Sequence, residues 1–236
     1  MIYFLLVIYS SIFVSFIQVA GECFPIKKSF LFRFSKCNYC QTELSFSQII
    51  PIYSFILLKG KSKCCKTSIP INYFLLELIT PIYFVLLHYQ FSFSYHFFIG
   101  SIMYYFLVFF FVTDILYMHV PNSVMIFFFS VLLVCYFFFQ QSIISLVYSS
   151  VISSCFYLVF FILFRKGIGL GDIKILIILS SFLGFEIGYS IFFLSIILGA
   201  TILLIALVLK KVEKNKQVPF VPYIFASYIL VSILMK

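Results

Sequence analysis

The chain has 236 residues, of which 64% are hydrophobic and 22% aromatic, with 35 Phe, 17 Tyr and no Trp. A soluble domain of this length cannot bury so much apolar surface, and long runs that are apolar on every face are unlike alternating barrel strands. Composition therefore excludes a soluble protein and a membrane β-barrel, and it predicts an all-α polytopic membrane protein.

Apolar runs of near-spanning length recur along the whole chain, and they predict about eight transmembrane helices. The first, residues 1–20, has no basic n-region and no small-x-small cleavage site, so we expect an uncleaved helix rather than a signal peptide. The sixth run is short and contains Gly184, so seven helices is the alternative count. The expected spans are 1–20, 71–89, 96–113, 122–139, 142–164, 173–185, 187–209 and 218–235.

The basic residues of the chain, which has a net charge of +9, gather on one side of this topology. Eight lie in residues 21–70, two in 165–172 and four in 210–217, whereas the connections near 90–95 and 140–141 carry none. Cytoplasmic loops are enriched in Lys and Arg, so the pattern predicts that these segments are cytoplasmic and that the N-terminus lies outside. The same pattern explains the positive charge without a nucleic-acid partner.

Residues 21–70 form the one long polar stretch, which we interpret as a small cytoplasmic module between helix 1–20 and a membrane domain over 71–236. A module of this size cannot bury a large core and is typically stapled by a metal. On the reducing cytoplasmic side, its cysteines favour a metal site over disulfides. The alternative is a set of free thiols, and Cys23 is an alternative fourth ligand. The expected ligands are Cys37, Cys40, Cys64 and Cys65.

Asp114 and Asp172 are the only aspartates, and each lies where an apolar run meets a turn on the expected inner face. A carboxylate beside hydrocarbon is costly and usually has a function or a partner. Two carboxylates within hydrogen-bonding distance cannot both ionise, so one can deprotonate water while the other protonates a leaving amine. The alternatives are a transporter that uses them as cation or proton sites, and a non-catalytic scaffold in which they only cap helices.

Several ordered motifs resemble those of the prepilin leader peptidases, membrane aspartyl enzymes that process type IV pilins and pseudopilins. They are Ser15–Val19 (S-F-x-N-V, with Gln18 at the Asn), Ser35–Cys40 and Gly60–Lys66 (cysteine knuckles), Ile71–Glu77, Asp114–Asn122 (D-x6-P-[ND]), Gly169–Lys174 (G-x-G-D-x-K) and Pro219–Tyr223 (P-F-x-P).

The resemblance implies a catalytic dyad of Asp114 and Asp172 that cleaves after a Gly, between a basic leader and a hydrophobic helix. It also implies a structural zinc ion and, in many members, N-methylation of the new amine with S-adenosylmethionine. Ser62 stands where the third cysteine of the family is expected, and Cys64 is the candidate replacement.

Four further residues are candidates for substrate binding or support. Glycines before Asp172 permit close backbone approach, and Lys174 is placed to bind a substrate carbonyl or to tune Asp172, with snorkelling to the interface as its alternative. Glu77 matches a family glutamate, and its alternative is a protonated, hydrogen-bonded side chain. We interpret His119 as interfacial. The four candidates are Gly169, Gly171, Lys174 and Glu77.

Overall fold

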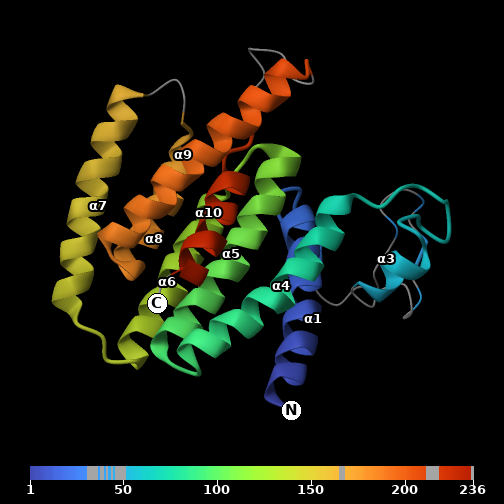
Figure 1. Ribbon diagram of the computed structural model, residues 1–236, viewed down its shortest axis with the longest axis horizontal. Helices are drawn as coiled ribbons and strands as arrows, with labels where there is room; N and C mark the ends of the chain where they lie inside the picture. Colours follow the sequence, from blue (N-terminus) through green and yellow to red (C-terminus); the bar gives the residue numbers. More distant parts are fainter. Residues whose placement is uncertain are drawn as a thin grey trace. The chain divides into compact units, whose positions relative to one another are not determined.

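The computed structural model describes residues 1–30, 37, 40, 42, 43, 45, 52–164, 168–210 and 218–234, and these form helices and turns without a β-strand (Figure 1). The expectation of an all-α protein is confirmed. The helices are α1 (Ile2–Cys23), α3 (Tyr53–Leu57), α4 (Ile71–Phe91), α5 (Tyr95–Tyr117), α6 (Asn122–Phe138), α7 (Ile143–Leu163), α8 (Leu170–Leu183), α9 (Phe185–Val208) and α10 (Val221–Leu234).

Eight of these helices coincide with the expected spans, and α3 is an addition that its five residues did not reveal. Five helices, α1, α4, α5, α7 and α9, are long and apolar enough to cross a membrane, whereas α6 and α10 are shorter apolar helices. The protein is therefore a multi-pass membrane protein. The sixth expected span is short, as anticipated, because α8 ends at Leu183 and Gly184 adopts a left-handed φ of 95° before α9 begins.

The chain divides into two compact units, residues 1–90 and 91–236. In the first unit, α1 and α4 are joined by polar side chains, because Gln18 donates to the carbonyl of Tyr73 (3.2 Å) and the Tyr73 hydroxyl donates to Glu22. Such bonds satisfy polar groups that lipid cannot. The expected boundaries at 20/21 and 70/71 stay a prediction.

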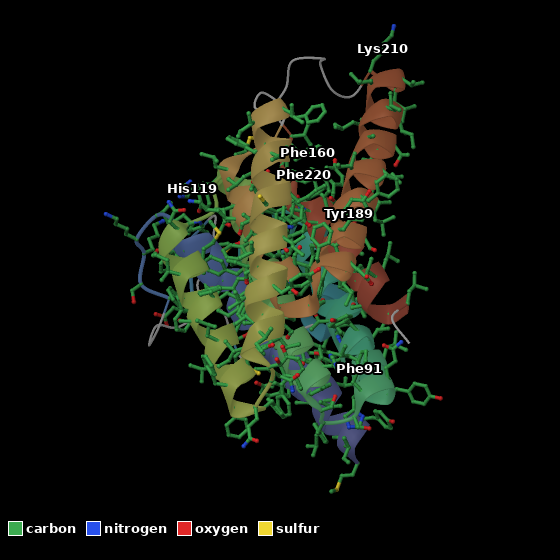
Figure 2. All side chains as sticks on the ribbon, turned by 90° about the vertical axis from the view of Figure 1, so that its left-hand side faces the viewer. Phe91, His119, Phe160, Tyr189, Lys210 and Phe220 are labelled. Atoms are coloured by element: carbon green, nitrogen blue, oxygen red, sulfur yellow. The ribbon has the colours of Figure 1, made fainter. Side chains whose placement is uncertain are left out.

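In the second unit, α5, α8 and α10 supply most of the buried side chains. Helix α10 packs between α5 and α9, and α8 packs against α6, α7 and α9. Outward-facing side chains of α7 and α9 are largely exposed, as expected of helices that face lipid. Figure 2 shows Phe160 on α7 and Tyr189 on α9, which belong to an aromatic group that also includes Phe156 and Phe192.

Helices α8 and α9 approach closely at Gly188. A Cβ at Gly188 would lie 2.4 Å from the Ser180 Cβ and 2.7 Å from its Cα, so no side-chain rotation could relieve the overlap. The same Ser180 forms a buried hydrogen bond of 2.9 Å with the Tyr157 hydroxyl of α7. Gly188 thus sets the spacing of three helices.

We expect Gly188→Ala to force α8 and α9 apart and to destabilise the protein by about 1–3 kcal/mol, the usual cost of overpacking. Thermal unfolding in detergent should show a midpoint lowered by several degrees. Ser190→Ala, on the exposed face of the same helix, is the control and should unfold like the parent protein. An unchanged midpoint for Gly188→Ala would contradict this packing.

Candidate active site

Asp114 lies in the last turn of α5 and is 7% exposed. Its Oδ2 accepts a hydrogen bond of 3.0 Å from the backbone N–H of Val221, the first residue of α10, and the backbone of Phe220 is a second partner. The first N–H groups of a helix have no partner within the helix, and together they favour a negative charge. The N-terminus of α10 therefore binds the Asp114 carboxylate directly.

Asp172 lies in the first turn of α8 and is 9% exposed. Its Oδ2 accepts a hydrogen bond from the N–H of Gly169, at 3.3 Å. The two aspartates lie close enough for the charge of Asp114 to act on Asp172. The structure thus brings together, in one helical unit, the two carboxylates that lie 58 positions apart in the sequence.

The glycines around Asp172 lie where a side chain would disturb the site. A Cβ at Gly171 would come within 3.1 Å of Val120, in the loop that follows Asp114. A Cβ at Gly169 would lie 3.1 Å from the Oδ2 of Asp172. Gly171 therefore allows the start of α8 to approach the end of α5, and Gly169 leaves room for the Asp172 carboxylate.

Lys174 and Asn122 form a third connection at the same end of the unit. The Lys174 Nζ donates to the Asn122 Oδ1 at 2.9 Å and so joins the first turn of α8 to the first residue of α6. The start of α8 contains Asp172, and the start of α6 follows the loop after Asp114. His119 is exposed in that loop (Figure 2), as expected of an interfacial histidine.

Two of the helices that begin at the site are short for a membrane. With 14 residues each, α8 and α10 are about 21 Å long, whereas the hydrocarbon core is about 30 Å thick. Non-helical backbone at membrane depth is tolerated where protein covers it or where it lines a water-filled cavity. The N-termini of α8 and α10 meet the aspartates where packed helices cover both carboxylates.

Sequence reasoning assigned no role to Val221, Phe220, Val120 or Asn122. The Pro219–Tyr223 motif was recognised, and its two prolines signal a helix start, but no spacing rule relates that start to an aspartate 107 residues earlier. Contacts of this kind depend on tertiary packing.

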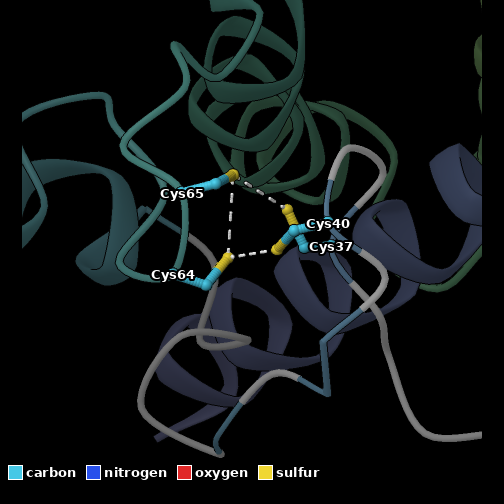
Figure 3. A group of neighbouring side chains, drawn as sticks. All are labelled: Cys37, Cys40, Cys64 and Cys65. Atoms are coloured by element: carbon cyan, nitrogen blue, oxygen red, sulfur yellow. Dashed lines mark hydrogen bonds between the residues drawn. The ribbon is translucent and has the colours of Figure 1, made fainter.

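A second group of functional side chains lies in the first unit, where Cys37, Cys40, Cys64 and Cys65 gather with all four Sγ atoms within 4.8 Å (Figure 3). The Sγ–Sγ distances are 3.7 Å for Cys37–Cys65, 3.8 Å for Cys64–Cys65 and 3.0 Å for Cys40–Cys64. A Zn–S bond of about 2.3 Å gives a tetrahedron with edges of about 3.8 Å. Two of the three distances match that edge, so the cluster could hold a metal ion.

The two cysteine knuckles repeat one hydrogen-bond pattern. The N–H of Cys37 donates to the carbonyl of Thr42, and the N–H of Ser62 donates to the carbonyl of Thr67. In each knuckle, the cysteine three residues after this donor is hydrogen-bonded to the hydroxyl of the same threonine. The Cys40 Sγ lies 3.0 Å from the Thr42 hydroxyl, and the Cys65 Sγ lies 3.1 Å from the Thr67 hydroxyl. Ser62 therefore occupies the position equivalent to Cys37.

Ser62 also acts on the thiol that follows it in the knuckle. Its Oγ lies 3.0 Å from the Cys65 Sγ, and hydrogen bonds from Ser62 and then Thr67 lower the pKa of Cys65 to about 6. A lowered pKa favours the thiolate, which is the form that binds metals. Cys23 is buried in α1 and is not part of this cluster.

Glu77 is half-buried on α4, in the first unit. Its Oε2 accepts a hydrogen bond of 2.8 Å from the backbone N–H of Ile52, and the Ser15 side chain is a second partner. Glu77 thus connects α4 to the start of α3. Its role in substrate binding or support stays a prediction.

Comparisons with known proteins agree with this division. The profile of the bacterial peptidase A24 N-terminal domain matches residues 8–91, and that of the type IV leader peptidase family matches residues 101–204. The second match contains both aspartates and the first contains the cysteine cluster. No solved structure matches the chain.

Curated relatives cover nearly all of the sequence. A prepilin leader peptidase/N-methyltransferase of Bacillus subtilis is 30% identical over 96% of this chain and 92% of the relative. Proteins of the same name from Neisseria gonorrhoeae (30% identical, 82% of this chain, 68% of the relative) and Stutzerimonas stutzeri (24% identical, 80% and 68%) match as well. The chain belongs to the type IV leader peptidase family.

Proposed function

We propose that the protein is an aspartyl endopeptidase that removes the leader peptide from type IV prepilins or pseudopilins. The observation that carries this proposal is the buried pair of Asp114 and Asp172 at one end of the second unit. Family membership favours this activity over a transporter or a scaffold. The charge distribution supports a cytoplasmic site, where the basic leader of the substrate would lie.

The surroundings of the aspartates support different roles for them. Each aspartate lies at a helix N-terminus, but Asp114 accepts a bond of 3.0 Å from the start of α10, whereas Asp172, similarly buried, accepts a longer bond of 3.3 Å within its own helix start. We therefore assign the negative charge to Asp114 and the proton to Asp172. Asp114 takes a proton from water as the water oxygen attacks the scissile carbonyl, and Asp172 gives its proton to the leaving nitrogen.

Replacing either aspartate by asparagine should reduce prepilin cleavage by a factor of about 10²–10⁴, because each change removes one proton-transfer group. Cleavage is measured by mass spectrometry of a co-expressed prepilin. Glu186→Gln, an exposed carboxylate on α9, is the control and should leave cleavage unchanged. Full cleavage by both Asn variants, at normal protein levels, would rule out the dyad.

Gly171→Ala should lower the rate of cleavage while the protein still accumulates, because the new methyl group presses on Val120 and moves Asp172 away from Asp114. In the double variant Gly171→Ala/Val120→Ala, the smaller side chain at position 120 makes room for the new methyl group, so part of the cleavage rate should be restored. Initial rates for the two single variants and the double variant measure this coupling. Purely additive effects would contradict the contact.

We also propose that the cysteine cluster holds a structural zinc ion bound by Cys37, Cys40, Cys64 and Cys65. Zinc would stabilise a module that has little core of its own. Ser62 occupies the first position of the second knuckle, so we assign the fourth ligand to Cys64. S-adenosylmethionine, as the methyl donor for the new N-terminus, is a further proposal that the names of the relatives support.

Cys64→Ser should weaken zinc binding, because it removes a thiolate, and Ser62→Cys/Cys64→Ser should restore it by placing a thiol at the position equivalent to Cys37. Zinc content after competition with a chelator, and the thiolate charge-transfer absorption of the Co²⁺ form, report this without reference to activity. Cys155→Ser, an exposed thiol of α7, is the control. Zinc binding that is unchanged in Cys64→Ser would exclude Cys64 as a ligand.

A further inference from the structure

Helix α3 exposes three large apolar side chains on one face. Tyr53, Ile56 and Leu57 are 52%, 62% and 59% exposed, and their spacing of three and four residues places them on the same side of the helix. Phe55 points the other way and stacks on Phe74 of α4, with ring centroids 4.4 Å apart. The exposed face is therefore held in a fixed orientation.

Two contacts hold α3 beside the start of α4. Phe74 is in the first turn of α4, a helix long and apolar enough to span the bilayer. Glu77, which accepts the N–H of Ile52, is six residues beyond the start of α4 at Ile71, or about 9 Å along its axis. Helix α3 thus lies beside the first two turns of a helix that is long and apolar enough to span the bilayer, and the ends of such a helix lie where headgroups meet acyl chains.

The segment that follows α3 is strongly basic. Lys59, Lys61, Lys63 and Lys66 are all exposed. They project from a turn that is closed by hydrogen bonds of 2.8 Å from Ile69 N–H to Gly60 O and from Ser62 N–H to Thr67 O. An apolar helix face beside a cluster of lysines has the chemistry of a membrane-surface element.

We propose that α3 and this turn form a docking surface for anionic phospholipids. The apolar side chains enter the acyl boundary, with Tyr53 at the level typical of interfacial aromatic residues, and the lysines bind headgroup phosphates. Each lysine near an anionic surface strengthens such binding roughly fivefold. The surface would hold the metal-binding module against the bilayer, and it consists of Tyr53, Ile56, Leu57, Lys59, Lys61, Lys63 and Lys66.

The absence of Trp from the sequence makes a direct test possible. The full-length variants Ile56→Trp and Phe55→Trp carry a single Trp on the outer and inner faces of α3, respectively. In nanodiscs of phosphatidylcholine and phosphatidylglycerol, lipids brominated on their acyl chains should quench Trp fluorescence of Ile56→Trp several-fold more than that of Phe55→Trp. The adjacent inner position is a matched control for folding and expression.

The charge requirement is tested in the Ile56→Trp background. Changing all four lysines to Gln, or omitting phosphatidylglycerol, should weaken quenching by brominated lipid and strengthen quenching by aqueous iodide. Quenching by brominated lipid that is insensitive to both changes would overturn the role of anionic headgroups. Efficient quenching of the Ile56→Trp fluorescence by iodide in anionic nanodiscs would overturn lipid docking. If added prepilin then protected this Trp from iodide, the exposed face of α3 would bind the substrate instead of lipid.

Discussion

The structure of the second unit depends on how two carboxylates are kept inside a membrane protein. An isolated charge in hydrocarbon is prohibitively costly, and lipid offers no hydrogen-bond donors. The unit meets this constraint with backbone N–H groups, from the start of α10 for Asp114 and from Gly169 for Asp172. Such donors belong to rigid helix ends and need no side-chain entropy to hold them in place. The positions of α8 and α10 are therefore tied to the positions of the carboxylates.

The same constraint accounts for where helices begin and where glycines lie. Helix α10 begins at Val221, so its first N–H groups lie beside Asp114. Gly171 then permits the start of α8 to contact the loop after Asp114, and Gly188 permits α8 to contact α9. Small residues are the usual means of close helix approach in membranes, because no hydrophobic force drives helices together there. The geometry of the site and the packing of the helices therefore both depend on the short helix α8.

Much of this arrangement was predictable from the sequence, because lipid imposes simple rules. Apolar run length locates eight helices, and the scarcity of carboxylates singles out Asp114 and Asp172. What was not predictable depends on contacts between distant segments, such as Val221 with Asp114 or Val120 with Gly171. Helix α3 was missed because its five residues, Tyr53–Leu57, are too few for a periodic signal. The cysteine spacing indicated a metal site, but the equivalence of Ser62 with Cys37 emerged only from their backbone hydrogen bonds.

The two units are stabilised by different physics, and this difference bears on how each can vary. In the second unit, the hydrogen bonds to the aspartates come from backbone N–H groups, and glycines permit the close approach of the helices. In the first unit, two knuckles bring four sulfur atoms within 4.8 Å of one another. Cys64 is the fourth thiol of this cluster, and the Ser62 hydroxyl is hydrogen-bonded to the Cys65 sulfur. A metal site tolerates a shifted ligand because the ion fixes only distances and angles between the ligand atoms, whereas a proton-transfer dyad depends on the environment of each carboxylate as well.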